Sequence, residues 1–250
     1  MNHIIKLLIL VSCLISYEQQ LIATDEPLSL YIETSEGSTN SKRRIASLKK
    51  YLNLNHCKVD TIQLDIKSDS QKTASLVFFP LNEQIPPGYQ QLVAIKTLNN
   101  ESLSASILVR GSTGIDNLAA LANTRVALLA PQSTLGYQLP VTMFKKAGVV
   151  HHDDKITQVD NNFAAISLLL HKDVFTSVIA TPLAKKWAVA NDLTIVATSD
   201  EVLPGGIWVR SDIDKLDTKA CREAFRSMSR SYSKDRKLMT VFPYWVEKFN

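Results

Sequence analysis

The sequence predicts an α/β fold, and three observations lead to this prediction. Short apolar runs typical of strands recur along the chain, and segments with apolar residues at helical spacing lie between many of them. The 250 residues are 45% hydrophobic, which is enough to bury the core of one large or two small domains. Because alternating strands and helices are typical of sheets covered by helices, we expect mainly parallel sheets.

The N-terminal half begins with a strand, a loop and a helix. Residues 28–32 alternate apolar and polar side chains, residues 33–40 are polar, and residues 46–52 carry apolar side chains at helical spacing. Further elements are expected as strands at residues 58–64, 74–79, 91–97 and 104–110, followed by a short helix at 115–122.

The C-terminal half repeats this alternation. We expect strands at residues 125–130, 155–159, 174–180, 193–197 and 205–210, and helices at 139–147, 162–170 and 183–191. The tail at residues 215–250 is charged and amphipathic, so it is predicted to be helical.

Charge is spread along the whole chain. The sequence has 28 basic and 24 acidic residues and a formal net charge of +4, without a long basic run. This distribution argues against a nucleic-acid partner.

The N-terminus has the pattern of an export signal. A positively charged start is followed by an apolar run over residues 7–15, interrupted only by Ser12, and a cleavage site is possible after Ala23. The run is too short to cross a bilayer, so residues 1–23 are predicted to be a removable signal peptide. The alternative is lipidation, because the residues ending at Cys13 resemble a bacterial lipobox.

Two cysteines, Cys57 and Cys221, remain if the signal peptide is removed. An exported chain meets conditions that permit disulfides, so the two cysteines can form a pair. Two inert buried thiols are the alternative, and the sequence alone leaves the choice open.

The stretch "APQSTLGYQLP" at residues 130–140 joins a predicted strand to a predicted helix. Ser133 and Thr134 offer hydroxyl donors, and Gly136 lets the backbone approach a bound group closely. Free N–H groups at a helix start favour anions, so the turn is a candidate oxyanion site. The alternative is that Ser133 or Thr134 only caps the helix.

Several chemical motifs are not found. The chain has no P-loop, no dinucleotide fingerprint, and no nucleophile elbow or HExxH sequence of a hydrolase. The run from His151 to Asp154 is better explained as a solvated loop than as a metal cluster, because adjacent side chains diverge. We therefore expect neither an enzyme nor a cofactor or metal.

Residues 105–140 resemble the phosphate/phosphite/phosphonate-binding proteins of ABC importers. The similarity lies in "ASILVR" at 105–110, "LAAL" at 118–121 and "RVALLAPQSTLGYQLP" at 125–140, where the family has a Ser-Thr-Ser-Gly-Tyr turn followed by a proline. Residues 162–174 and 202–210 are also similar to family segments.

The resemblance implies a type 2 periplasmic binding protein, in which two α/β lobes joined by two crossing hinge strands close on a ligand. Residues 27–106 and 207–250 would form lobe one, and residues 107–206 lobe two. The crossing strands would lie at 104–110 and 207–210.

The function implied by the resemblance is solute binding. The chain would be a periplasmic, non-enzymatic binding protein that closes on a small, anionic ligand and presents it to a membrane permease or sensor protein. A sensory or accessory module of the same fold, with weak or no ligand binding, is the alternative.

The resemblance also implies a set of ligand-binding positions, of which three depart from the family. Leu135 replaces the third hydroxyl of the turn, Asn162 stands where the family has histidine, and Phe175 where it has aspartate. Each hydrogen bond lost to a buried oxyanion costs about 1 to 3 kcal/mol, so weak phosphonate binding is expected. The candidate ligand-binding residues are Ser133, Thr134, Leu135, Gly136, Tyr137, Asn161, Asn162, Phe79 and Ser35.

Overall fold

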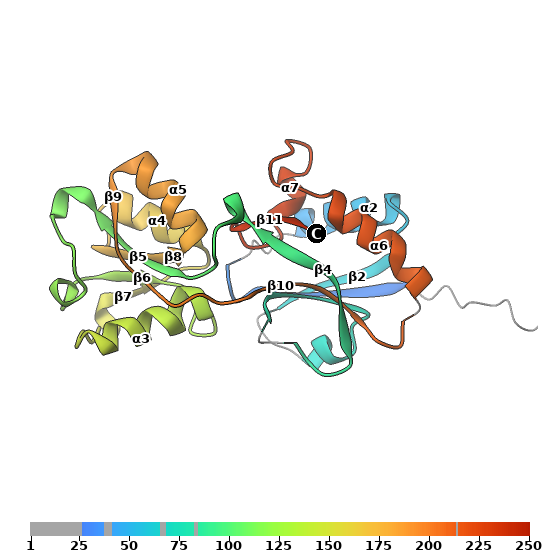
Figure 1. Ribbon diagram of the computed structural model, residues 1–250, viewed down its shortest axis with the longest axis horizontal. Helices are drawn as coiled ribbons and strands as arrows, with labels where there is room; N and C mark the ends of the chain where they lie inside the picture. The colour runs from blue at the N-terminus through green and yellow to red at the C-terminus, as the bar shows by residue number, and fades with distance from the viewer. Residues whose placement is uncertain (1–26, 38–41, 66–68, 83–84, 214) are drawn as a thin grey trace, which may run out of the picture.

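The computed structural model describes residues 27–37, 42–65, 69–82, 85–213 and 215–250. The predicted signal peptide at residues 1–23 and the alternative lipidation site at Cys13 lie outside the described residues. Two sheet-containing lobes lie side by side, joined by two extended connections (Figure 1).

Lobe one is built on a six-stranded sheet. Helices α2 (Lys42–Leu54), α6 (Lys215–Ser227) and α7 (Arg236–Met239) lie on one of its faces (Figure 1). The strands, in the order β11-β4-β10-β3-β1-β2, are Val246–Phe249, Tyr89–Thr97, Pro204–Arg210, Leu76–Leu81, Leu28–Glu33 and Val59–Asp65.

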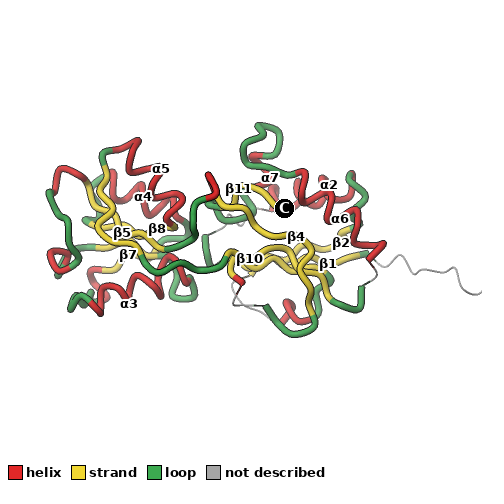
Figure 2. Tube along the Cα trace, viewed as in Figure 1, coloured by secondary structure: helices red, strands yellow, loops and turns green. Residues whose placement is uncertain are grey.

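Lobe two is built on a five-stranded sheet with helices on both faces. Helices α4 (Asn162–Leu170) and α5 (Thr181–Asn191) cover one face, and α3 (Leu139–Lys146) covers the other (Figures 1 and 2). The strands, in the order β7-β6-β8-β5-β9, are Ile156–Gln158, Val126–Leu128, Thr176–Ala180, Ala105–Arg110 and Leu193–Thr198.

The sheets are mixed, which corrects the expectation of mainly parallel sheets. Strand β1 runs parallel to β2 and β3, and β6 runs parallel to β7 and β8. Strands β5 and β10, which carry the chain from one lobe into the other, pair antiparallel with their neighbours. Each of these two strands is therefore antiparallel to its neighbours in the sheet that it enters.

The strand pairing shows where the chain passes from one sheet to the other. Ala105 and Ser106 pair in the second sheet, and residues 204–206 pair in the first. The two connections between the sheets are thus residues 98–104 and 199–203. Below, lobe one means residues 27–97 and 204–250, and lobe two means residues 105–198.

Two predicted helical segments are helical only in part: the tail contains α6 and α7, and residues 115–122 contain a single short turn. The tail ends in a strand, β11, because Val246 and Phe249 are buried and pair with β4. Residues 115–122 form one 3₁₀ turn, Ala119–Leu121, where the Asn117 side chain accepts a hydrogen bond from Ala120 N and closes the turn locally.

A disulfide and a cluster of aromatic rings join the layers of lobe one. Cys57, which follows α2, is bonded to Cys221 in α6, so the alternative that the sequence left open is resolved as a pair. The ring of Phe78 in β3 packs 4.9 Å from that of Phe242 and 6.4 Å from that of Phe249. These contacts hold the C-terminal segment against β3 and against the residue that follows α2.

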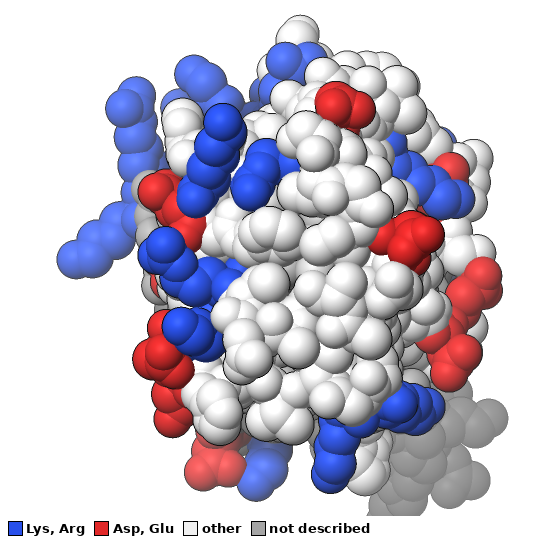
Figure 3. Space-filling view, turned by 90° about the vertical axis from the view of Figure 1, so that its left-hand side faces the viewer, with Lys and Arg blue, Asp and Glu red and all other residues white. Residues whose placement is uncertain are grey.

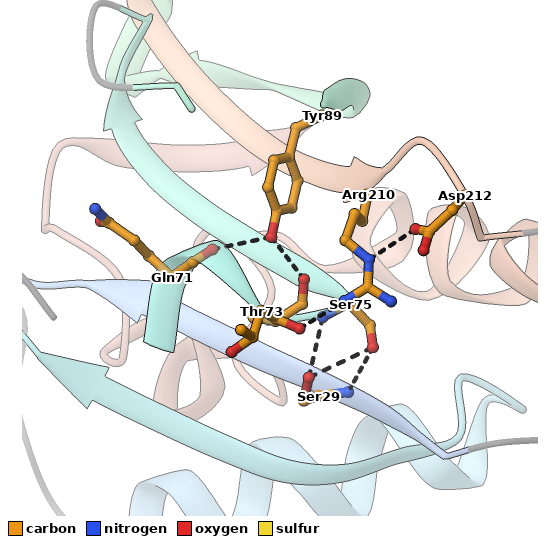
Figure 4. Close-up of polar contacts among 8 residues, drawn as sticks. Ser29, Gln71, Thr73, Ser75, Tyr89, Arg210 and Asp212 are labelled. Carbon is orange, nitrogen blue, oxygen red and sulfur yellow. Dashed lines mark hydrogen bonds and ion pairs between the residues drawn. The ribbon is translucent and has the colours of Figure 1, made fainter. Parts of the chain in front are cut away.

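A polar network fastens the segment that precedes β3 (Figure 4). Tyr89 Oη donates to Ala74 O at 2.7 Å and to Gln71 O at 2.9 Å. Arg210 Nη1 donates to Thr73 O at 2.6 Å, and Arg210 Nε to Asp212 Oδ1 at 2.7 Å. Strands β4 and β10 are therefore tied to the same loop, far from the facing ends of the two lobes.

The surface of the lobe-two end has no continuous charged patch. Basic and acidic side chains lie mostly toward the rim of this view, and uncharged residues occupy its middle (Figure 3). Among the described residues, none of the helices combines the length and apolar character that a membrane crossing requires.

Candidate functional site

The strand-to-helix turn after β6 presents hydrogen-bond donors toward lobe one. Residues Thr134–Gln138 form one π-helical turn, and α3 begins directly after it, with Pro140 in its first turn. Ser133 is fully buried, and its Oγ accepts a hydrogen bond from Gly136 N at 2.8 Å. The predicted cap is therefore present, and the Ser133 hydroxyl proton is left for a second partner. We call residues 133–136 the donor turn.

That second partner is a carboxylate from lobe one. Ser133 Oγ donates to Glu36 Oε2 at 2.9 Å, and Thr134 N donates to Glu36 Oε1 at 2.7 Å. Leu135 N lies 3.3 Å from both carboxylate oxygens. One hydroxyl and two main-chain N–H groups thus surround both oxygens of Glu36, in the manner expected for a bound oxyanion.

Glu36 reaches lobe two because the loop after β1 packs tightly against it. Gly37 has φ +78°, and a Cβ there would lie 3.0 Å from Asn161 Cα and 3.1 Å from Leu129 Cδ2. Gly136 also packs against Leu129, because a Cβ there would lie 2.6 Å from Leu129 Cβ. Glycine at both positions therefore allows the loop and the donor turn to meet around Leu129.

Burial dominates the electrostatics of Glu36. The residue is 1% exposed, and desolvation raises the pKa of its carboxyl from 4.5 to about 7. The hydrogen bonds from Ser133, Leu135 and Thr134 act in the opposite direction but are outweighed. Near neutral pH both the protonated and the ionised forms are populated.

Of the other predicted residues of the turn, some donate to Glu36 through the main chain and one packs in the core of lobe two. Thr134 contributes its main-chain N–H to Glu36, as does Leu135, whose side chain is buried in the hydrophobic core. Tyr137 is partly buried against the core of lobe two, beside Phe144 and Leu128. The loss of a hydroxyl at Leu135 therefore leaves the main-chain donor in place.

Outside the turn, the predicted ligand-binding residues cap a helix or are buried. Asn161 caps α4, since its Oδ1 accepts from Phe163 N and Ala164 N, each at 3.0 Å. Asn162 is buried, in the first turn of α4. Phe79 is 1% exposed and packs with Tyr31, Ala74 and Val77 in lobe one.

Ser35 directly precedes Glu36 in the sequence but binds a residue of its own lobe. Its Oγ donates to Glu33 Oε2 at 3.0 Å, and its N–H donates to Glu33 Oε1 at 2.7 Å. Ser35 thus satisfies a second buried carboxylate, three residues before Glu36. Glu33, the last residue of β1, is thus hydrogen-bonded within lobe one, whereas Glu36 reaches lobe two.

Sequence reasoning missed Glu36, although the loop containing it was expected near the ligand. The available signal was an acid directly before a glycine in the loop after the first strand. Within the described part of the chain, no three His, Cys, Asp or Glu side chains converge as metal ligands would. The His151 ring instead packs against Phe144, with centroids 4.6 Å apart.

Solved structures share this fold across most of their length. A binding protein component of an ABC phosphonate transporter from Pseudomonas aeruginosa is 12% identical, with TM-score 0.59, covering 90% of this chain and 81% of that one. PhnD1 from Prochlorococcus marinus in complex with methylphosphonate is 11% identical, with TM-score 0.61 and 91% and 93% covered. A Xanthomonas citri protein bound to chloride is 14% identical, with TM-score 0.56 and 90% and 91% covered. The chain therefore has the type 2 periplasmic binding protein fold.

The family is shown by a sequence model. Residues 81–250 match the model of the phosphonate periplasmic substrate-binding proteins of ABC transporters, and the chain belongs to this family. The family consists of substrate-binding proteins and not of enzymes. A comparison with curated proteins finds no match.

Proposed function

We propose that this chain is an exported, non-enzymatic solute-binding protein that closes on a small anionic ligand and delivers it to the permease of an ABC importer. The observation that carries the proposal is the donor turn, where Ser133 Oγ, Thr134 N and Leu135 N converge on two carboxylate oxygens at the lobe interface. Uncharged donors in this arrangement suit an oxyanion better than a cation or an apolar group.

Export is supported by two features. The pattern of residues 1–23 is that of a signal peptide, and the bond between Cys57 and Cys221 is of a kind that persists in oxidising compartments. Mass spectrometry of the mature protein distinguishes cleavage after Ala23 from lipidation at Cys13.

A ligand screen tests the proposal. Thermal shift and titration calorimetry would be run with inorganic phosphate, methylphosphonate, acetate, nucleotides and amino acids, since a ligand of the folded state raises the melting temperature. We expect a saturable shift with at least one anion, and a weaker one in Ser133→Ala. A shift produced only by cations or neutral solutes would contradict the assignment.

The second candidate function is a sensory or accessory module with weak or no ligand binding. It is favoured by one observation, that a carboxylate of the chain already fills the donor turn. Such a module would act through protein contacts, and pull-down with a neighbouring permease or sensor protein separates it from an importer component.

A further inference from the structure

We infer that Glu36 is a tethered occupant of the donor turn, which a diffusing oxyanion must displace, and that it therefore sets the affinity of the site. The inference rests on the proposed function, since it concerns the same donors. It also makes Glu36 a determinant of specificity in a position that the resemblance did not suggest.

The donors of the donor turn that face Glu36 are all hydrogen-bonded to its carboxylate. Each carboxylate oxygen has two donors within 3.3 Å: Thr134 N and Leu135 N at Oε1, and Ser133 Oγ and Leu135 N at Oε2. Ser133 is 0% exposed and Glu36 is 1% exposed, so the carboxylate and its hydroxyl donor are shielded from solvent. An added oxyanion can reach them only after Glu36 has left.

The tether makes this displacement difficult. Glu36 stands three residues after the last residue of β1, and the Gly37 backbone is packed against Asn161 and Leu129. A group held so close to its site acts at an effective concentration in the millimolar range or above, so it competes strongly with a dilute free ligand. The same tether links lobe one to lobe two, because the acid and its donors belong to different lobes.

Charge adds to this competition. A phosphonate brought beside an ionised Glu36 would place two anions in one buried space, where like charges repel strongly. Removal of the carboxylate should have the opposite effect. The main-chain N–H groups of Thr134 and Leu135 and the Ser133 hydroxyl would be left buried and unpaired, and an external oxyanion would then satisfy them.

Glu36→Ala tests the inference, because the atoms it removes are those of acetate, a methyl carbon and a carboxylate. We expect acetate to raise the melting temperature of Glu36→Ala in a saturable way while leaving that of the wild type unchanged. Methylphosphonate should bind this variant at least about tenfold more tightly than the wild type. Glu36→Ala combined with Ser133→Ala is the matched control and should respond less to both anions.

A second variant and a second measurement cover the case in which Glu36→Ala is too unstable to study. Glu36→Gln keeps the shape of the side chain but sets an amide NH₂ against N–H donors, so it too should bind methylphosphonate more tightly than the wild type. Small-angle scattering should show a larger radius of gyration for Glu36→Ala without anion, and a return to the wild-type value with acetate.

The outcomes separate this inference from the proposed function. If anions bind the wild type and both Glu36 variants equally, Glu36 does not occupy the ligand site, and the inference is overturned while solute binding stands. If no anion affects any of the proteins, the donor turn is not an anion site, and both fail. If the Glu36 variants bind anions and the wild type binds none, the inference holds and the accessory function is favoured.

Discussion

The interior of lobe one and the interface between the lobes are held together by contacts of opposite character. In lobe one, the Cys57–Cys221 bond and the rings around Phe78 join helices, strands and the C-terminal segment. Across the interface, the buried carboxylate of Glu36 rests on three uncharged donors. Covalent and apolar contacts persist whatever anion is present, whereas an oxyanion can replace a carboxylate. If an oxyanion displaces Glu36, as we infer, the contacts within lobe one stay fixed while those of the interface exchange.

The largest expected effect on stability comes from removing the disulfide of lobe one. Replacement of both Cys57 and Cys221 by serine opens a covalent loop with a sequence separation of 164 residues. In the chain-entropy model such a loop contributes about 5 kcal/mol to the free energy of unfolding. Urea unfolding followed by tryptophan fluorescence, to which Trp208 and Trp245 of lobe one contribute, should report this loss. Unchanged unfolding of lobe one would show that the bond adds nothing to its core.

A smaller effect on stability is expected from a change of pH, which alters the charge of Glu36 at the interface between the lobes. The pKa of the Glu36 carboxyl is raised by burial from 4.5 to about 7, so the folded state holds the proton more tightly than the unfolded state. The contribution of Glu36 to stability is therefore greatest below pH 4.5, falls as the pH rises to about 7, and is lower by about 3 kcal/mol above that.

Glu36→Gln provides the control for this pH dependence. Glutamine does not titrate, so the difference in unfolding free energy between wild type and Glu36→Gln should decline between these two pH values. The donors to Glu36 are a hydroxyl and main-chain N–H groups, which do not titrate, and every other titratable group is common to the two proteins. A difference that stays constant with pH would mean that Glu36 is ionised throughout.

The sequence was sufficient where structure depends on neighbours in the chain. The helix predicted at residues 162–170 agrees with α4, because Asn161 caps it and no residue breaks it. The donor turn was found because Ser133, Gly136 and Pro140 mark a strand-to-helix junction locally.

Prediction failed where structure depends on distant partners. The strand β11 is buried because Val246 meets Thr97 in β4, and no local pattern records that pairing. Glu36 meets Ser133 across 97 positions of sequence, so its loop resembles a solvated polar segment until both lobes are placed. A buried acid in such a loop cannot be told from an exposed one by its neighbours alone.

A moderate effect is expected from the donor side of the interface. Ser133→Ala removes the hydrogen bond from Gly136 N and the one to Glu36, so the free energy of unfolding should fall by about 2 kcal/mol. Thr134→Ala is the matched control, because its contact to Glu36 is through the main-chain N–H, which alanine keeps. Equal losses in the two variants would show that the effect comes from the turn as a whole and not from the Ser133 hydroxyl.

The smallest effect is expected from an exposed contact to lobe two. Lys185 in α5 forms an ion pair with Glu101 in the first lobe connection, and the two side chains are 53% and 30% exposed. Exposed pairs contribute about 0 to 1 kcal/mol, because water and salt screen the charges and two long side chains lose freedom. A double-mutant cycle with Lys185→Ala and Glu101→Gln should therefore give a coupling energy below about 1 kcal/mol that shrinks further in salt. A larger coupling energy that salt does not reduce would mean that this ion pair stabilises the arrangement of the lobes. The contact of Glu36 with the donor turn would then not be alone in doing so.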